Sequence, residues 1–193
     1  MNPKIPSSKI VREYLKKWDN LENYVAQESS LTKLFASTYR TNTHLDDVLI
    51  KVCSLNDFYS TNILNPFRVA KHIVSLKIDN DLAAEDLEIV NKIALIRMNE
   101  TKTVNFYSFA SKYCSHHRPK VFPIYDSFVE RMLMHFKRQD DFALFKKGDL
   151  RDYPKYRHII VQFRSFYGLD QFDLKQIDKY LWQAGKEHFP RRY

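Results

Sequence analysis

Glycine and cysteine are scarce in this chain of 193 residues, which contains three glycines and two cysteines. Tight turns between strands commonly need glycine, so the shortage favours packed helices, and we expect an all-α protein with no strand. The two cysteines, Cys53 and Cys114, cannot supply the four thiolates of an iron–sulfur cluster. Each falls within an apolar helical pattern and is predicted to be a buried, reduced side chain.

Long apolar runs are also missing, both at the N-terminus and elsewhere, so we expect a cytoplasmic protein without membrane contact. The chain has no glycine-rich phosphate loop, no Gly-x-Ser-x-Gly elbow and no His-Glu-x-x-His motif. These absences remove support for nucleotide hydrolysis, serine hydrolysis and zinc proteolysis. The adjacent His116 and His117 have no cysteine or acidic partner at a familiar spacing, so we expect neither a metal nor a cofactor.

Positive charge is in excess, with 31 lysines and arginines against 23 acidic residues and a formal net charge of +8. The basic residues are spread over predicted turns and helix ends, which is typical of a folded surface. This balance favours a polyanionic partner. The alternative is a basic protein whose charge only aids solubility.

Apolar residues recur at helical spacing along nearly the whole chain. The periodic segments predict about eight to ten helices in one multi-helix domain spanning residues 1–193, with residues 1–43 as a candidate N-terminal extension. Ser7 or Ser8 is expected to cap the first helix, and Pro66 is expected near the start of a later one.

Several smaller features complete the predicted fold. A turn is expected at residues 79–81 and an exposed loop at residues 141–154. Trp18 and Trp182 fall on apolar stripes and are predicted to lie in the core. Gly168 is expected to end a helix, while a glycine in the last helix either ends it or allows close packing.

Residues 106–129 are the most informative stretch. A first helix with an aromatic face leads into a basic turn, and Pro119 and Pro123 prevent either flanking helix from running through it. The single acid Asp126 then stands at the head of a second helix. A carboxylate there is favoured by the unpaired backbone N–H groups of the first turn, which is a purely structural explanation of the residue.

This arrangement resembles the core of the helix-hairpin-helix DNA glycosylase superfamily, which includes endonuclease III and the 8-oxoguanine glycosylases. Pro123 and Asp126 match the Pro-x-x-Asp segment that opens a helix in that family. Residues 45–63 resemble an early family helix and its polar turn, in which Asn56, Asp57 and Tyr59 would help to open the duplex. The resemblance covers residues 45–137.

The resemblance implies a fold of helix-hairpin-helix glycosylase type, double-stranded DNA as the partner, and a base-excision activity in which Asp126 is the catalytic acid. In a flipped-base enzyme such a carboxylate stabilises positive charge on the sugar or activates water. Tyr125 is a candidate for stacking on the base, although packing in an aromatic core is the alternative. Further candidate DNA contacts are Lys102, His116, His117, Arg118 and Lys120.

The family lysine that forms a Schiff base in bifunctional members has no ungapped match. Ser108 occupies the corresponding position, and Lys112, a candidate catalytic residue, lies one helical turn later. A monofunctional glycosylase is therefore favoured over a lyase. Lys112 as an exposed or snorkelling side chain is the alternative.

The predicted hairpin is the largest departure from the family pattern. Residues 97–106, RMNETKTVNF, contain no glycine, and Asn99 is the residue best suited to a left-handed turn. This departure keeps two other interpretations open: a catalytically inactive nucleic-acid-binding module of the same fold, and a helical interaction protein without a nucleic-acid role. The sequence identifies neither the lesion nor the oligomeric state.

Overall fold

The computed structural model describes residues 2–190. Its internal contacts divide the chain into two compact units. Unit 1 combines two separate stretches, Met1–Val25 and Pro123–Tyr193, whereas unit 2 is the continuous stretch Ala26–Phe122. The candidate N-terminal extension, residues 1–43, is thus divided between the two units. That the chain forms one domain stays a prediction.

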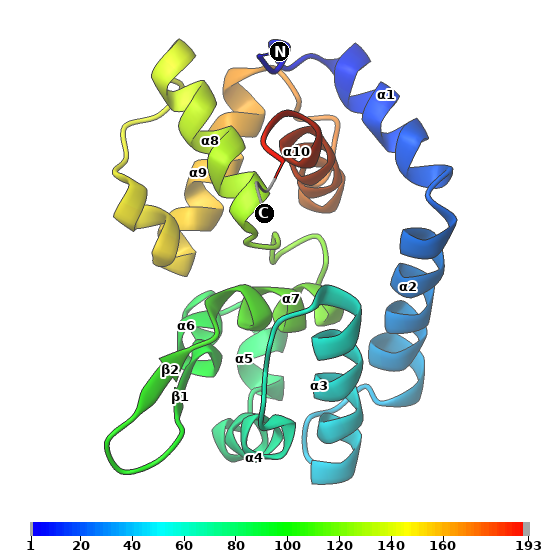
Figure 1. The fold of residues 1–193 in the computed structure, drawn as a ribbon, viewed down its shortest axis with the longest axis vertical. Coiled ribbons are helices and arrows are strands. Elements are labelled where there is room, and N and C mark those ends of the chain that lie inside the picture. The colour runs from blue at the N-terminus through cyan, green and yellow to red at the C-terminus, as the bar shows by residue number, and fades with distance from the viewer. Residues whose placement is uncertain (1, 191–193) are drawn as a thin grey trace. The chain divides into compact units, whose positions relative to one another are not determined.

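Helices make up nearly all the regular structure of the described residues (Figure 1). The all-α class is therefore confirmed, and the ten α-helices agree with the expected number. The glycosylase-type fold stays a prediction. In chain order the helices are α1 (Ser8–Asp19), α2 (Glu22–Lys33), α3 (Leu45–Tyr59), α4 (Pro66–Leu76), α5 (Asp79–Ala83), α6 (Glu88–Ala94), α7 (Tyr107–His117), α8 (Ser127–Asp140), α9 (Tyr153–Phe166) and α10 (Leu174–His188), with a π-helical turn η1 (Leu34–Thr38) and a 3-10 turn η2 (Lys147–Arg151).

The core of unit 2 lies where α3 packs against α4 and α7, and where α6 packs against α4 and α7. Helix α4 begins as its sequence predicts. The side chain of Asn65 accepts a hydrogen bond from Arg68 N at 3.0 Å, and Pro66 occupies the first turn. Proline fits there because no intrahelical partner is needed for its missing N–H. The buried core residues of these helices include Val48, Val52, Leu55, Val69, Ile73, Val90, Ile93, Phe109 and Tyr113.

A two-stranded antiparallel sheet, β1 (Leu95–Arg97) and β2 (Thr103–Asn105), occupies the predicted hairpin region. The expectation of no strand was wrong. Each strand has only three residues, which is too short for the period-2 pattern to be distinguished in the sequence. The helices α6 and α7 are therefore joined by a β-hairpin.

Asn99 shapes the hairpin loop in a different way from the one expected. It is absent from the described residues with positive φ, so its backbone is not left-handed. Instead, Asn99 Oδ1 accepts hydrogen bonds from Thr101 N at 3.0 Å and from Lys102 N at 2.7 Å. An asparagine side chain that bonds the backbone ahead of it closes the loop without glycine.

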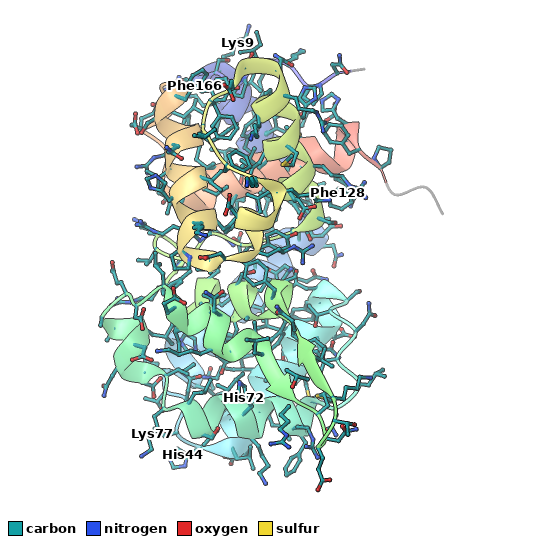
Figure 2. The ribbon with its side chains drawn as sticks, turned by 90° about the vertical axis from the view of Figure 1, so that its left-hand side faces the viewer. Lys9, His44, His72, Lys77, Phe128 and Phe166 are labelled. Atoms are coloured by element: carbon teal, nitrogen blue, oxygen red, sulfur yellow. The ribbon has the colours of Figure 1, made fainter. Side chains whose placement is uncertain are left out.

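Helix α10 is central to unit 1, where it packs against α1, α8 and α9. Its contact with α8 requires Gly185, because a Cβ atom at this position would lie 2.7 Å from the backbone oxygen of Phe128 (labelled in Figure 2). This confirms the close-packing alternative for that glycine. Ser7 caps α1 by accepting from Ile10 N, and Gly168 follows α9 with φ of 63°, both as predicted.

Two predictions about burial were wrong. Cys53 is exposed, because the buried face of α3 carries Val48, Lys51 and Val52 and leaves the cysteine on the outside. Trp18 and Trp182 are half-buried, because they lie at the surface of unit 1 and pack against each other there.

Two predictions about loops also need correction. Residues 79–81 belong to the short helix α5 instead of a turn. The segment 141–154 includes η2 and the start of α9, and Phe142, Phe145 and Leu150 are buried. These apolar side chains anchor the segment to its unit, so it is an ordered connection between α8 and α9. Among the described residues, no helix combines the length and apolarity needed to cross a membrane.

Candidate functional site

Asp126 is the N-cap residue of α8 and comes from the segment that the sequence singled out. Its Oδ1 accepts a hydrogen bond from Phe128 N at 2.8 Å, and its backbone oxygen accepts from Glu130 N at 2.9 Å. The other carboxylate oxygen, Oδ2, has no hydrogen-bond partner among the residues that the structure describes. The side chain is half-buried. One oxygen therefore serves the helix, while the other remains available to a ligand.

The backbone that leads to Asp126 is held from three directions. Tyr153 donates its hydroxyl proton to Pro123 O at 2.7 Å, and Tyr156 donates to Ile124 O at 2.6 Å. Ile124 N in turn donates to the carboxylate of Asp178 at 3.3 Å. All three side chains are buried in unit 1. This anchoring fixes the position from which the carboxylate of the next helix projects.

A charged cluster adjoins this segment in unit 1. Tyr125 donates a short hydrogen bond to Glu130, and the same carboxylate lies 3.3 Å from Lys147 Nζ and 3.5 Å from an Arg151 guanidinium nitrogen. The guanidinium also lies 4.7 Å from the centre of the Tyr125 ring. Burial and the bond to Glu130 raise the pKa of the Tyr125 hydroxyl. A stacking role for this ring would require the arginine to move.

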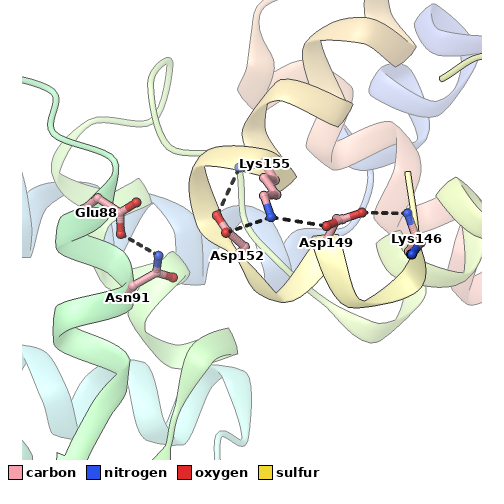
Figure 3. A network of polar contacts seen from close by, with 6 residues as sticks. All are labelled: Glu88, Asn91, Lys146, Asp149, Asp152 and Lys155. Atoms are coloured by element: carbon pink, nitrogen blue, oxygen red, sulfur yellow. Dashed lines mark hydrogen bonds and ion pairs between the residues drawn. The ribbon is translucent and has the colours of Figure 1, made fainter. Parts of the chain in front are cut away.

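The cluster rests on a braced turn. Lys155 Nζ lies 3.4 Å from a carboxylate oxygen of Asp149 and 3.4 Å from one of Asp152, and Asp149 also accepts from Lys146 N at 2.7 Å (Figure 3). These contacts tie η2 to the first turn of α9 and so position Arg151, which lies between the two aspartates. Sequence reasoning missed Glu130 and Arg151. The available signal was the spacing of four residues between Asp126 and Glu130, which places both acids at the start of one helix.

A second group of candidate residues meets in unit 2, between α3 and α7. The hydroxyl of Tyr59 and Nε2 of His116 are hydrogen-bonded at 3.0 Å, and Lys112 Nζ lies 5.2 Å from the centre of the Tyr59 ring. The amine of Lys112 also donates to the hydroxyl and backbone oxygens of Ser108. Lys112 is thus hydrogen-bonded to Ser108, the residue that the sequence resemblance aligned with the Schiff-base lysine.

The end of α3 differs from the polar turn that was expected. Asn56, Asp57 and Tyr59 lie within the last helical turn. The side chain of Asn56 holds the following loop, because it accepts from Ile63 N at 2.8 Å and donates to Ile63 O at 3.1 Å. Asp57 is exposed. The turn itself begins at residue 60.

This loop presents one residue that sequence reasoning missed. Ser60 and Asn62 both have positive φ, at 48° and 58°, and Leu64 is 96% exposed. A single exposed leucine is common on protein surfaces, and Leu144 is exposed to the same extent, so Leu64 is a candidate contact residue only because its loop follows the predicted contact residues of α3. The signal was present in the sequence as two apolar residues, Ile63 and Leu64, between two asparagines.

The remaining predicted DNA contacts are dispersed over unit 2. Lys102 is exposed in the hairpin loop, and Lys120 is exposed in the turn after α7. Arg118 donates to Leu82 O at 3.3 Å and to Ala83 O at 3.2 Å, at the end of α5. Its guanidinium therefore caps a helix, where a cation is favoured by the helix dipole.

His117 belongs to a buried polar network of unit 2. Its Nε2 lies 3.2 Å from Asn42 Oδ1, which also accepts from Tyr113 OH at 2.5 Å and from Lys51 Nζ at 2.6 Å. The asparagine in turn donates its backbone and side-chain N–H groups to Asp79 at 2.9 and 2.6 Å. Burial, together with the nearby Lys51 charge, lowers the pKa of His117 to about 3.

Lys51 is fully buried within this network. Its ammonium group donates to Tyr39 O at 3.1 Å and to Thr41 O at 2.9 Å, in addition to Asn42. Burial lowers the pKa of Lys51 to about 8, an effect that the charges of Asp79 and Asp47 oppose. Sequence reasoning missed this lysine, because its acceptors are mostly backbone oxygens of a loop.

Metal binding finds no geometric basis in the described residues, where no group of three His, Cys, Asp or Glu side chains is arranged to hold an ion. The two cysteines are both free.

Comparison with known proteins gives a family and a relative. The family model HI_0787_N, described as an N-terminal domain, matches residues 10–121. The match ends just before the segment that carries Asp126. An uncharacterized protein of Haemophilus influenzae (strain ATCC 51907 / DSM 11121 / KW20 / Rd) is 42% identical over 151 residues, which is 78% of this chain and 72% of that protein. No solved structure matches the chain.

Proposed function

This chain belongs to the HI_0787_N family, and we propose that it is a cytoplasmic DNA-binding protein that removes a damaged or modified base as a monofunctional N-glycosylase. The observation that carries the proposal is the carboxylate of Asp126. The segment before it is held by hydrogen bonds from Tyr153 and Tyr156. One carboxylate oxygen accepts a hydrogen bond from the first turn of α8, and the other has no hydrogen-bond partner among the described residues. The proposed fold type is that of the helix-hairpin-helix glycosylases.

The proposed reaction is hydrolysis of the bond between a base and its sugar. The base departs with the bonding electron pair and takes up a proton, while a water oxygen bonds to the sugar carbon and loses its proton. Asp126 would stabilise the positive charge that develops on the sugar or accept the proton of the water. A residue in either role needs a free oxygen and a fixed position.

Lys112 supports hydrolysis over the lyase reaction. Its amine is engaged as a donor to Ser108 and lies over the ring of Tyr59. A lysine acts as a nucleophile only when its amine can reach the opened sugar, whereas this side chain is 4% exposed, neither exposed nor snorkelling, and its amine is already engaged. In the proposal, Lys112 and His116 orient Tyr59 at the end of α3.

The proposed DNA contacts come from exposed groups of unit 2. Lys102 and Lys120 would contact phosphates, while Leu64 would contact the base stack, as apolar side chains do when they enter a duplex. Arg118 would contribute indirectly, by holding the end of α5, because its guanidinium already donates to the last backbone oxygens of that helix. Asn56 would set the shape of the Leu64 loop.

A second candidate function is a catalytically inactive DNA- or RNA-binding module. The β-hairpin between α6 and α7 favours it. A glycine turn can present backbone N–H groups to a phosphate, but here the side chain of Asn99 takes two of the loop's N–H groups. Those donors are no longer available for the phosphate.

The test is base release from labelled duplexes that each carry one lesion, read with and without alkali. Strand breaks only after alkali are expected for the native protein and should be lost in Asp126→Asn, which retains a capping oxygen. Breaks without alkali would overturn the monofunctional assignment and make Lys112 a nucleophile. Silence across a broad panel with DNA binding intact would favour the inactive module.

DNA binding is measured separately, as affinity for an undamaged duplex over a range of salt concentrations. Lys102→Gln with Lys120→Gln should weaken binding and reduce the salt slope by about two. Lys4→Gln with Lys9→Gln removes the same charge from unit 1 and serves as the control. No affinity even at low salt would exclude both nucleic-acid functions and favour a helical interaction protein.

A further inference from the structure

A pocket of about 420 Å³ lies on unit 1, where the last turns of α1 and α10 meet the start of α2. Small-molecule sites have volumes of roughly 300–1,000 Å³, so the pocket is large enough for a ligand of that class. None of the residues singled out for Asp126 chemistry lines it. Its walls include Tyr14, Lys17, Tyr24, Trp182, Lys186 and Glu187.

The rings of Tyr24 and Trp182 line the pocket, and the ring of Trp18, which is not a lining residue, packs against both of them. The ring centres of Tyr24 and Trp182 are 5.1 Å apart, and that of Trp18 is 5.9 Å from each of them. All three side chains are only half-buried. Rings in a closed core would be covered on all sides, whereas these keep surface that a flat ligand can contact.

Lysines surround the same rings. Lys186 Nζ lies 5.1 Å from the ring centres of both Tyr24 and Trp182, and Lys179 Nζ lies 4.7 Å from that of Trp18. The rings therefore already have cations over them. An added cationic ligand would be repelled by these ammonium groups, which excludes the use of the rings as a cage for a quaternary amine.

One acid lies among the cations. Glu187 accepts from Tyr14 OH at 3.1 Å and from Lys17 Nζ at 3.3 Å. With two lysines, Lys17 and Lys186, and one acid, Glu187, at its wall, the pocket keeps an excess of positive charge. Its chemistry is thus apolar and aromatic inside, with ammonium groups at the edge.

We infer that this pocket binds a nucleoside monophosphate, either free or as one unit of a single strand. The base would lie against Tyr24 and Trp182, and the phosphate would meet Lys17 and Lys186. Base–aromatic contact combined with phosphate–lysine contact is the pattern by which proteins hold unpaired nucleotides. The inference goes beyond the proposed function, because it involves neither Asp126 nor the contacts of unit 2.

Intrinsic fluorescence reports on this pocket, because of the protein's two tryptophans Trp182 lines it and Trp18 packs against Trp182. The full chain is titrated with AMP, adenosine, inorganic phosphate and an adenine hexanucleotide. AMP should quench the fluorescence saturably, adenosine should bind about tenfold more weakly or less, and phosphate alone should leave the emission unchanged. A hexanucleotide that binds more tightly than AMP identifies the strand as the source of the ligand.

Charge variants sharpen the test in opposite directions. Lys17→Gln with Lys186→Gln should weaken AMP binding about tenfold or more, whereas Glu187→Gln should strengthen it. Lys4→Gln with Lys9→Gln, exposed residues outside the pocket wall (Lys9 is labelled in Figure 2), should leave it unchanged. The inference is overturned if neither AMP nor the hexanucleotide quenches saturably, or if quenching is the same in the double lysine variant and the native protein. Neither result depends on base release.

Discussion

Two polar regions of this protein, the Asn42 network (the closed cluster) and the surroundings of Asp126 (the open cluster), differ in how completely their groups are hydrogen-bonded. In unit 2, Asn42 is bonded on both sides: its side-chain oxygen accepts from three donors, and its backbone and side-chain N–H groups donate to Asp79. In unit 1, the carboxylate of Asp126 uses one oxygen for a helix cap and has no described partner for the other. A cluster that satisfies all its own groups stabilises a fold, whereas one that leaves a group open can bind or react.

Burial follows the same division. Asn42 and Lys51 are 1% and 0% exposed, whereas Asp126 is half-buried. A fully buried charge is expensive unless it is fully bonded, so the unit 2 cluster tolerates little change. The half-buried carboxylate can exchange its free oxygen between water and a ligand at little cost. The closed cluster is therefore the structural one, and the open cluster is the functional candidate.

Replacement of Lys51 should have the largest effect on stability. Lys51→Met removes the donor to Tyr39 O and Thr41 O and deprives the network of its cation. We expect a loss of about 3 kcal/mol or more in the free energy of unfolding. Urea denaturation followed by circular dichroism measures it, with hydrogen exchange of α3 and α7 to locate the change.

The matched control is Lys71→Met, an exposed lysine on the neighbouring helix α4. It should change the free energy of unfolding by about 0.5 kcal/mol or less. Equal effects of the two substitutions would show that the buried network contributes nothing specific, and the contrast between the clusters would then fail.

Removal of one hydroxyl beside Asp126 should have an intermediate effect. Tyr153→Phe leaves the oxygen of Pro123 without its donor in a buried place, which should cost about 1–2 kcal/mol. It should also reduce base release, because the segment before Asp126 loses an anchor. Urea denaturation and the base-release assay measure the two effects.

Tyr39→Phe is the control for this substitution, since no hydrogen bond of the Tyr39 hydroxyl occurs in the described structure. It should leave stability nearly unchanged. If Tyr153→Phe lowers stability but base release per folded molecule stays at the native value, the tyrosine has no positioning role.

Acid should weaken the closed cluster through His117. Its pKa is about 3 in the folded protein, because of burial and the charge of Lys51, against about 6.5 in the unfolded chain. A depressed pKa gives stability that is fully present above about 6.5 and is lost as the pH falls toward 3. The slope can reach about 1.4 kcal/mol per pH unit.

The measurement is urea denaturation of native protein and His117→Gln over a pH range from about 5 to about 7. Glutamine keeps a donor for Asn42 Oδ1 but does not titrate in this range. The variant should therefore show a shallower dependence of stability on pH than the native protein. Two parallel curves would mean that the histidine takes up its proton without leaving the cluster.

Local signals in the sequence predicted helix ends well. Ser7, Pro66 and Asp126 lie at helix starts as expected, and Gly168 lies at a helix end, because each acts on backbone groups within a few residues. The β-hairpin was not predicted, because its strands are short and its loop is closed by hydrogen bonds to the Asn99 side chain instead of by a glycine.

Long-range partners could not be predicted in the same way. Asn42 bonds Asp79 and Tyr113 at sequence separations of 37 and 71 residues. Trp18 meets Trp182 from the opposite end of the chain. Nothing in the local pattern of an apolar stripe tells a core ring from one at a surface pocket, since both lie on the same face of a helix. The resemblance singled out Asp126, but the hydroxyl groups that brace it became visible only in the fold.

Substitution of Asp126 itself should have the smallest effect on stability. Asparagine caps helices about as well as aspartate, so Asp126→Asn should change the free energy of unfolding by about 0.5 kcal/mol or less. Asp126→Ala removes the acceptor for Phe128 N and should cost about 1 kcal/mol. Both variants should lose base release in the proposed function. If urea denaturation shows a loss above about 2 kcal/mol for Asp126→Asn, the carboxylate has a structural role like that of the closed cluster. A loss of that size is expected only when the replaced charge is fully hydrogen-bonded within the protein.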